Sequence, residues 1–234
     1  QVWAAKYVTD PTTGEVVTAP EYGGTLTYVQ PGYEENQIDP YYCCGAPYFI
    51  GGVSETLGIS DWGVDRDVFD LPIVYLPSEQ VKGLLAESWE ISPDGLTWTF
   101  HIRKGVRWHN KPPMNGRAFT AADVEFNLRR VYALGEFSEA EPSTRVGGLP
   151  IESVTATDKW TVEIKLGRFD LDALMKIGTG YGYYMMPPEV IRRDGKINRA
   201  DWKNLVGTGP YEITDWVEGS SVTYTKNPDY WGTD

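Results

Sequence analysis

The stretch at residues 84–134 constrains the fold more than any other part of the chain. It contains the sequence LTWTFHIR, where apolar residues fill every second position: Leu96, Trp98, Phe100 and Ile102. Side chains on a β-strand point alternately to opposite faces, so these four share one face. Pro93-Asp94-Gly95 lies just before them, and this order suits a tight turn because glycine adopts positive φ readily. The stretch therefore predicts an antiparallel hairpin with one apolar face.

The second half of this stretch, FTAADVEFNLRRV, predicts a helix that begins after Thr120. Thr120 suits the N-cap position, and Asp123, three residues on, can complete a capping box. Apolar residues then recur at helical spacing: Val124, Leu128 and Val131. Gly135 follows the last turn, and we expect it to end the helix in the left-handed conformation.

Two further hairpins are predicted nearer the C-terminus. IESVTAT and WTVEIKL flank Asp158-Lys159, and apolar residues alternate in the second of these segments. YEITDWV and SSVTYTK flank Glu218-Gly219 in the same way. Before them, GTGP at residues 207–210 predicts a tight backbone turn that leads into the strand starting at Tyr211.

The remaining elements alternate between strands and helices. TLTYV at residues 25–29 predicts a strand. A short helix is expected at residues 171–177. Another is expected in PPEVIRRDG, with Pro188 at its first position and Gly195 at its exit. This interleaving indicates an α/β protein with a mixed sheet.

Composition and charge exclude several classes of protein. The 234-residue chain is 41% hydrophobic, enough to bury a full-sized core in one or two domains. No run approaches the roughly 20 apolar residues that a membrane span needs. The N-terminus lacks the pattern of an export signal, so we expect any such signal to have been removed. The net charge of −12 repels phosphate backbones, so we expect no nucleic-acid partner.

Few residues are of the kinds that carry catalysis or bind metals. Cys43-Cys44 are neighbours, and a disulfide between neighbours requires a strained ring, so two free thiols are favoured. His101 lies on the polar face of a strand and His109 in a loop, neither with a ligand or base at suitable spacing. The acidic run DWGVDRDVFD lacks the spacing of a calcium loop. We therefore expect no catalytic residue, no metal site and no cofactor.

Aromatic residues are unusually frequent. Nine Trp and fifteen Tyr exceed what a core of this size requires. They favour a recognition surface for sugars, peptides or other flat or apolar ligands, or else an aromatic core and interface. Composition leaves both interpretations open.

Several blocks, in this order, resemble one family of proteins. LLAESWEISPDGLTWTFHIRKGVRWHN, FTAADVEFNLRRV, VGTGPYEITDWVEG and NPDYWG resemble the extracytoplasmic solute-binding proteins of ABC importers. The matching branch, solute-binding protein family 5, includes oligopeptide-, dipeptide- and nickel-binding members. GGTLTYV and Ile38-Asp39-Pro40 resemble the opening of the same family. The resemblance runs from about Gly23 to Gly232.

The resemblance implies a periplasmic-binding-protein-like type II fold with two lobes and an inserted subdomain. Residues 23–48 and 178–234 would form an incomplete first lobe, in which the strand at residues 25–29 shares a sheet with the strand from Tyr211. Residues 49–177 would form the inserted subdomain. Residues 1–22 are expected to be a flexible arm, and the second lobe is absent from this chain.

The resemblance also suggests ligand-binding residues. In peptide-binding members, the stretch just after the Asp-Pro step pairs its backbone with an extended ligand. Here Cys44 stands where an acidic side chain can occur, so a charge contact with a ligand amine is lost. A loop after the helix at residues 120–134 supplies an aromatic wall in some members. The candidates are Cys44, Gly45, Ala46, Phe137, Tyr181 and Tyr183, and for each side chain packing in a core or interface is the alternative.

The function implied by the resemblance is binding and not catalysis. We expect the extracytoplasmic solute-binding component of an ABC transporter, a monomer that captures a small solute and delivers it to a membrane permease. Peptide is the favoured ligand because uncharged backbone-pairing positions suit extended chains; oligosaccharide is the alternative because aromatic faces stack on sugar rings. A hydrolase or a non-transport interaction module on the same scaffold is less favoured. The location would be the periplasm, or the cell surface through a lipid anchor.

Overall fold

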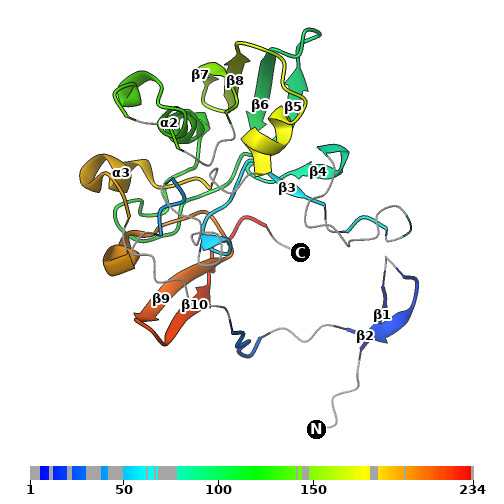
Figure 1. Cartoon of the computed structure of the whole chain (residues 1–234). Coiled ribbons are helices and arrows are strands. Elements are labelled where there is room, and N and C mark those ends of the chain that lie inside the picture. Colours follow the sequence, from blue (N-terminus) through cyan, green and yellow to red (C-terminus); the bar gives the residue numbers. More distant parts are fainter. Residues whose placement is uncertain are drawn as a thin grey trace.

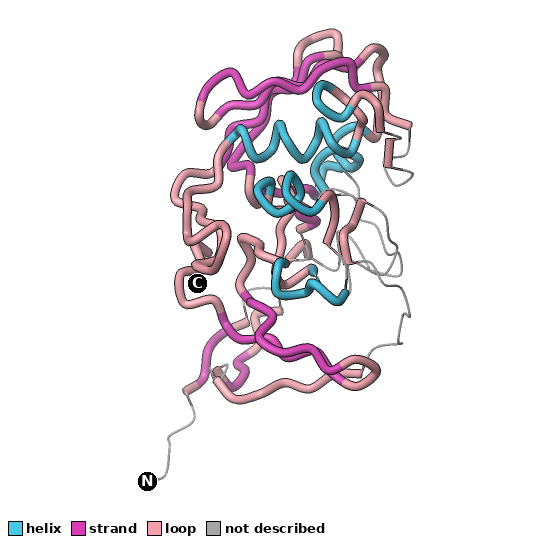
Figure 2. Tube along the Cα trace, turned by 90° about the vertical axis from the view of Figure 1, so that its left-hand side faces the viewer, coloured by secondary structure: helices cyan, strands magenta, loops and turns pink. Residues whose placement is uncertain are grey.

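The computed structural model describes most of the chain. The described residues are 6–10, 13–19, 23–29, 38–41, 50–61, 63–65, 67, 78–140, 142–143, 148–179, 184–197 and 199–232. A sheet with a helix packed against it lies at the top of the molecule in Figures 1 and 2, and the hairpin of residues 211–226 lies toward the bottom. Among the described residues, no helix has both the length and the apolar character that a bilayer crossing requires.

A four-stranded antiparallel sheet contains two of the predicted hairpins. Its strand order is β5-β6-β8-β7, formed by β5 (Ala86–Ile91), β6 (Thr97–Ile102), β8 (Thr161–Leu166) and β7 (Ile151–Asp158). The turn between β5 and β6 is confirmed: the Gly95 amide donates to Ser92 at 2.8 Å, and Gly95 has a φ of +72°. Trp98, Phe100 and Ile102 all face the core, as their alternation predicts. The β6–β8 pair joins the two hairpins into one sheet.

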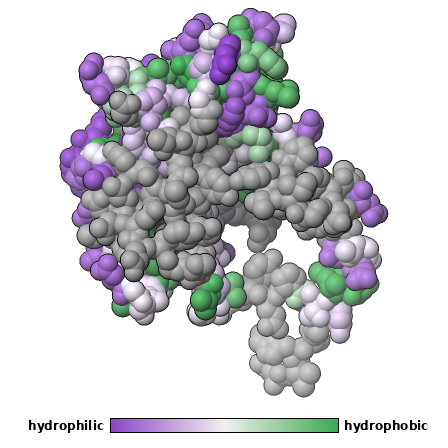
Figure 3. All heavy atoms as spheres, in the orientation of Figure 1, coloured by the Kyte–Doolittle hydropathy of each residue, from purple (hydrophilic) through white to green (hydrophobic). Residues whose placement is uncertain are grey.

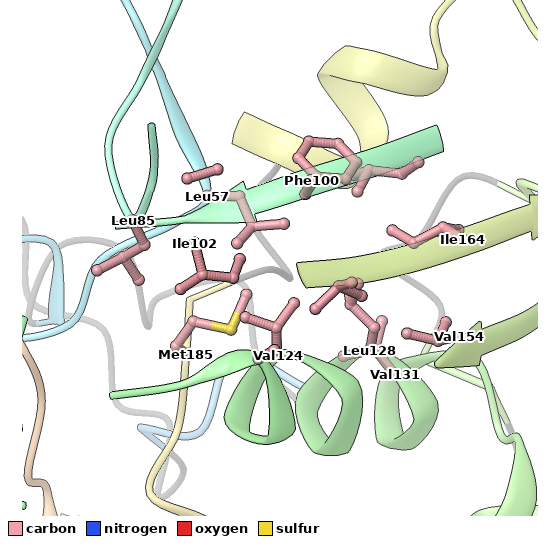
Figure 4. Close-up of a cluster of buried hydrophobic side chains, with 14 of the residues drawn as sticks. Leu57, Leu85, Phe100, Ile102, Val124, Leu128, Val131, Val154, Ile164 and Met185 are labelled. Carbon is pink, nitrogen blue, oxygen red and sulfur yellow. The ribbon is translucent and has the colours of Figure 1, made fainter. Parts of the chain in front are cut away.

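The predicted helix packs on this sheet. Helix α2 (Ala121–Val131) begins after Thr120, which forms the predicted capping box with Asp123. Figure 4 shows side chains of α2 meeting those of the strands in the main core, including Val124, Leu128, Phe100, Val154 and Ile164. Burial of each such side chain contributes about 1.5–3 kcal/mol, so this contact holds helix and sheet together.

The end of α2 differs from the prediction. The left-handed residue after the C-cap is Ala133 (φ +55°), whereas Gly135 (φ +58°) starts the short helix η2 (Gly135–Phe137). The Leu134 amide donates to the Arg129 carbonyl at 2.8 Å, and the Ala133 amide donates to Arg130 at 3.3 Å. These two bonds form a Schellman motif. The helix therefore ends two residues before the predicted position.

A second apolar cluster lies beside α2. Helix α3 (Pro188–Asp194) has Pro188 at its start and Gly195 (φ +76°) at its end, as predicted. The short helix η4 (Arg199–Asn204) and the hairpin of β9 (Tyr211–Val217) and β10 (Ser221–Lys226) come after it. The buried members of the cluster are Ile38, Ile50, Val53, Phe126, Met186, Val190, Ile191, Ile197, Leu205 and Ile213.

Smaller elements complete the body. β3 (Gly58–Ser60) pairs with β4 (Val81–Gly83), and η1 (Ser78–Gln80) precedes β4. The short helix predicted at residues 171–177 is present as helical turns that include the π-helix η3 (Met175–Thr179). Its start is later than predicted.

The N-terminal region departs most from the predictions. Residues 25–29 form no strand, and β9 pairs only with β10 among the described strands. Leu26 and Val29 are 88% and 95% exposed, so this segment lacks the packing surface that would order it as a strand. All strand pairs described are antiparallel. The expected mixed sheet is therefore not found in the described part of the chain.

A hairpin that the sequence did not predict lies within the expected N-terminal arm. β1 (Tyr7–Thr9) pairs with β2 (Val16–Thr18), and every residue of both strands is exposed. Figure 3 shows apolar surface on this hairpin, at the lower right. A two-stranded hairpin of this length is marginally stable without a covering surface.

Candidate functional site

Five of the six predicted ligand-binding residues lie outside the described part of the chain: Cys44, Gly45, Ala46, Tyr181 and Tyr183. The sixth, Phe137, packs edge-on against Phe126 of α2, with ring centroids 5.3 Å apart. Phe137 thus belongs to the second apolar cluster, and its role in an aromatic ligand wall stays a prediction. The predicted ligand-pairing stretch lies within residues 42–48, and the structure describes residues 38–41 before it and residues 50–61 after it.

Residues 38–41, before this stretch, are held by a buried ion pair. Arg130 of α2 donates two hydrogen bonds to the Asp39 carboxylate, at 3.1 and 2.6 Å. The Asp39 side chain is fully buried, and the Arg130 side chain is 6% exposed. Asp39 also accepts the backbone amide of Tyr41 at 3.1 Å. The pair therefore connects α2 to the backbone that leads into residue 42.

Further contacts hold the same residues. The Arg130 guanidinium lies 4.7 Å from the centroid of the Tyr41 ring and donates to the Gly195 carbonyl at 3.3 Å. Ser143 donates its hydroxyl to the Tyr41 carbonyl at 2.9 Å. The Ile38 amide donates to the Ile197 carbonyl at 3.3 Å. Residues 38–41 are thus bonded to α2 and to the segment just after α3.

Residues 50–54, after the stretch, form a helical turn fixed by the GTGP segment. Gly209 donates its amide to the Val53 carbonyl at 2.8 Å, and Tyr211 donates to Gly52 at 2.9 Å. A Cβ atom on Gly207 would lie 1.8 Å from the Val53 carbonyl oxygen, which no side chain can tolerate. The tight turn predicted at residues 207–210 is confirmed, and glycine is required there because two backbones meet.

A buried histidine also holds the tight turn at residues 207–210. Gly207 donates its amide to Nδ1 of His109 at 3.2 Å, so Nε2 carries the ring proton and donates to the Gly209 carbonyl at 2.9 Å. Burial lowers the pKa of His109, against smaller opposing effects of the Gly209 hydrogen bond and the Glu212 carboxylate; Lys111 lowers it further. His109 therefore has a structural role, which the sequence did not reveal because its partners lie 98 and 100 residues away.

The NPDYWG block folds back onto a buried carboxylate. Tyr230 donates its hydroxyl to Glu55 at 2.9 Å, and the Trp231 indole donates to the same carboxylate at 3.0 Å. The Arg103 guanidinium lies 4.8 Å from the Trp231 ring. Burial raises the pKa of Glu55, while the hydrogen bonds and Arg103 oppose the rise. Residues 230–231 are thereby fixed against the body beside residues 50–57.

Three of the buried ionisable side chains are engaged in structural contacts: Asp39, Glu55 and His109. Within the described part of the chain, no three His, Cys, Asp or Glu side chains form a group that could hold a metal ion. The arrangement can hold two backbone segments rigidly on either side of residues 42–48, as a backbone-recognition site needs.

Comparison with known proteins identifies the family. The model of bacterial extracellular solute-binding proteins, family 5 Middle, matches residues 80–234. The chain belongs to this family, so the resemblance read from its sequence is confirmed. Its members are the solute-binding proteins of ABC transporters, which are not enzymes.

The relatives that this chain matches are longer proteins. The dipeptide-binding protein of Escherichia coli is 32% identical over 171 residues, which are 67% of this chain and 31% of that protein. Heme-binding protein A of Haemophilus influenzae is 32% identical over 164 residues, 66% of this chain and 30% of that protein. The chain thus spans about a third of these relatives.

The fold is shared with a solved peptide complex. The periplasmic binding protein DppA of Helicobacter pylori, in complex with the peptide STSA, superposes with a TM-score of 0.66 and 25% identity. The match covers 86% of this chain and 39% of that protein. The chain therefore has a mixed α and β fold that corresponds to a portion of such binding proteins.

Proposed function

We propose that this chain is part of the peptide-binding component of an ABC importer. The observation that carries the proposal is its family membership combined with similarity to a dipeptide-binding relative and to a solved peptide complex. The anchored backbone on both sides of residues 42–48 supports it, because extended peptides are recognised through backbone pairing with a rigid strand or loop.

The proposed architecture follows the predicted lobes. Residues 23–48 and 178–234 belong to a first lobe, and residues 49–177 to an inserted subdomain of a type II binding-protein fold. Helix α3 and β9 of the proposed first lobe share one apolar cluster, to which Ile50, Val53 and Phe126 of the proposed subdomain also contribute. The second lobe would come from sequence outside these 234 residues.

In the proposed mechanism, a peptide bridges two lobes and shifts an open–closed equilibrium toward the closed state. The shift equals the difference in the peptide's affinity for the two states. Cys44, Gly45 and Ala46 pair with the peptide backbone, and an aromatic wall encloses it. The closed protein delivers the peptide to a membrane permease outside the cytoplasm.

The contacts of the two histidines bear on whether haem is an alternative ligand to peptide. The similarity to a haem-binding relative is of equal strength in sequence. His109, however, uses both ring nitrogens in buried backbone hydrogen bonds and cannot bind iron without breaking them. His101 lies on β6, where it faces Glu90. Of the two histidines, His109 is thus committed to structural hydrogen bonds and gives no support to a haem ligand.

Native mass spectrometry of the natural protein, with any sequence that flanks these 234 residues, tests the proposal. The protein is incubated separately with a pool of di- to pentapeptides, a panel of oligosaccharides and haem. Adducts with peptides alone are expected. Adducts confined to sugars or haem would refute the peptide assignment, and release of hydrolysed product would refute a binding role.

A further inference from the structure

The Asp39–Arg130 pair is an unusual way to hold a chain segment. Its members lie 91 residues apart in sequence, and both side chains are almost completely removed from solvent. Removing two charges from water offsets most of their attraction, so such pairs contribute little net stability compared with apolar side chains of similar size. Their advantage is geometric, because a guanidinium fork fixes both the distance and the orientation of a carboxylate.

Arg130 joins α2 to two other parts of the chain, residues 38–41 and the exit of α3. Besides Asp39, its guanidinium contacts the Tyr41 ring and the Gly195 carbonyl at the exit of α3. Arg130 itself lies in the last turn of α2, whose apolar face is packed into the core. Arg130 therefore ties residues 38–41 to a packed helix, in addition to their hydrogen bonds with Ser143 and Ile197.

The neighbouring arginine on α2 has different contacts. Arg129 pairs with Glu125 one turn earlier and donates Nε to the Val154 carbonyl of β7 at 2.9 Å. Its side chain is 35% exposed, and it bonds to the sheet on the other side of the helix. Arg129 therefore provides a matched control on the same helix.

We propose that Arg130 is a positioning residue for ligand binding, which fixes residues 38–41 through Asp39 and so sets the place from which the chain enters the peptide-binding stretch. The inference rests on the proposed function. It assigns control over affinity to a buried side chain that makes no direct ligand contact in this role. Geometry and not charge carries the effect, so lysine cannot replace arginine.

Two variants of the natural protein test this role. In Arg130→Lys the charge stays and the fork is lost; peptide affinity should fall about threefold to tenfold. In the double variant Arg130→Met/Asp39→Leu both charges are removed together, which leaves no unpaired buried charge; affinity should fall about tenfold or more with little change in the melting temperature. Arg129→Met should bind peptide within about twofold of wild type.

Hydrogen–deuterium exchange of the ligand-free protein gives a readout independent of the ligand. In both Arg130 variants the amides of residues 38–41 should exchange faster, while those of α2 remain as in wild type. Unchanged exchange at residues 38–41 would overturn the inference even if no peptide is ever bound. So would wild-type affinity in a folded double variant, or in Arg130→Lys if the double variant does not fold. Failure of wild type to bind peptides refutes the proposed function and leaves the exchange result to decide the positioning role.

Discussion

Replacement of Asn127 by alanine tests the junction between α2 and the chain entering α3. The Asn127 side chain is 4% exposed, and its amide pairs with both backbone groups of Met186: it donates to the carbonyl at 3.0 Å and accepts the amide at 2.9 Å. It also donates to the Asp123 carbonyl within α2 at 2.9 Å. Met186 is buried, so water cannot replace these bonds without opening the structure.

The expected cost depends on the groups that lose their partners. Asn127→Ala leaves the Met186 amide and carbonyl unsatisfied, and each buried unsatisfied group costs about 1–3 kcal/mol. Alanine's better helix propensity recovers about 0.5 kcal/mol. A net loss of about 3 kcal/mol is expected, which corresponds to a fall in melting temperature of about 6–12 °C for a chain of this size.

Urea denaturation monitored by tryptophan fluorescence measures this loss. Asn110→Ala is the control, because Asn110 is exposed and its replacement should change stability by less than about 0.5 kcal/mol. A loss below about 1 kcal/mol for Asn127→Ala, comparable to the control, would show that the Asn127 side chain does not hold the Met186 backbone.

Three other predictions concern the anchors and the helix end. Gly207→Ala places Cβ 1.8 Å from the Val53 carbonyl oxygen; it should destabilise the chain by more than about 3 kcal/mol in denaturation, and a loss under about 1 kcal/mol would contradict the close approach. Ala133→Gly relieves the left-handed conformation (φ +55°) and should raise stability by about 0.5–1 kcal/mol; a decrease in the denaturation midpoint would argue against the Schellman end. Burial lowers the pKa of His109, so the unfolded state binds its proton first and the stability contributed by His109 should be lost as pH falls below about 6.5. The stability difference between wild type and His109→Gln, measured from pH 7.5 to 5, should shrink as pH falls, and a difference independent of pH would refute the neutral buried ring.

Local features of the fold were predictable from the sequence. The turn at Gly95, the capping box of Thr120 and Asp123, and the proline start and glycine exit of α3 all depend on residues within a few positions of one another. Each is fixed by backbone sterics or by short-range hydrogen bonds. The end of α2 was predicted at the wrong residue: Gly135 has the positive φ that its residue type favours, but Ala133 adopts the left-handed conformation first, and its residue type gives no signal for that.

Contacts between distant residues were not predictable in the same way. Asp39 and Arg130 lie 91 residues apart, and Glu55 and Tyr230 lie 175 apart. No periodicity or spacing links such pairs, since their meeting depends on how complete elements pack. The strand expected at residues 25–29 failed for a related reason: alternation indicates a strand, but a strand forms only where a partner edge and a packing surface are present.

Mapping hydrogen exchange of the natural protein with and without a saturating peptide tests the central claim most directly. The account predicts peptide-dependent protection centred on residues 42–48, with residues 38–41 and 50–54 already protected in the free protein. Protection that appears elsewhere in the chain while residues 38–54 exchange equally with and without peptide would contradict it.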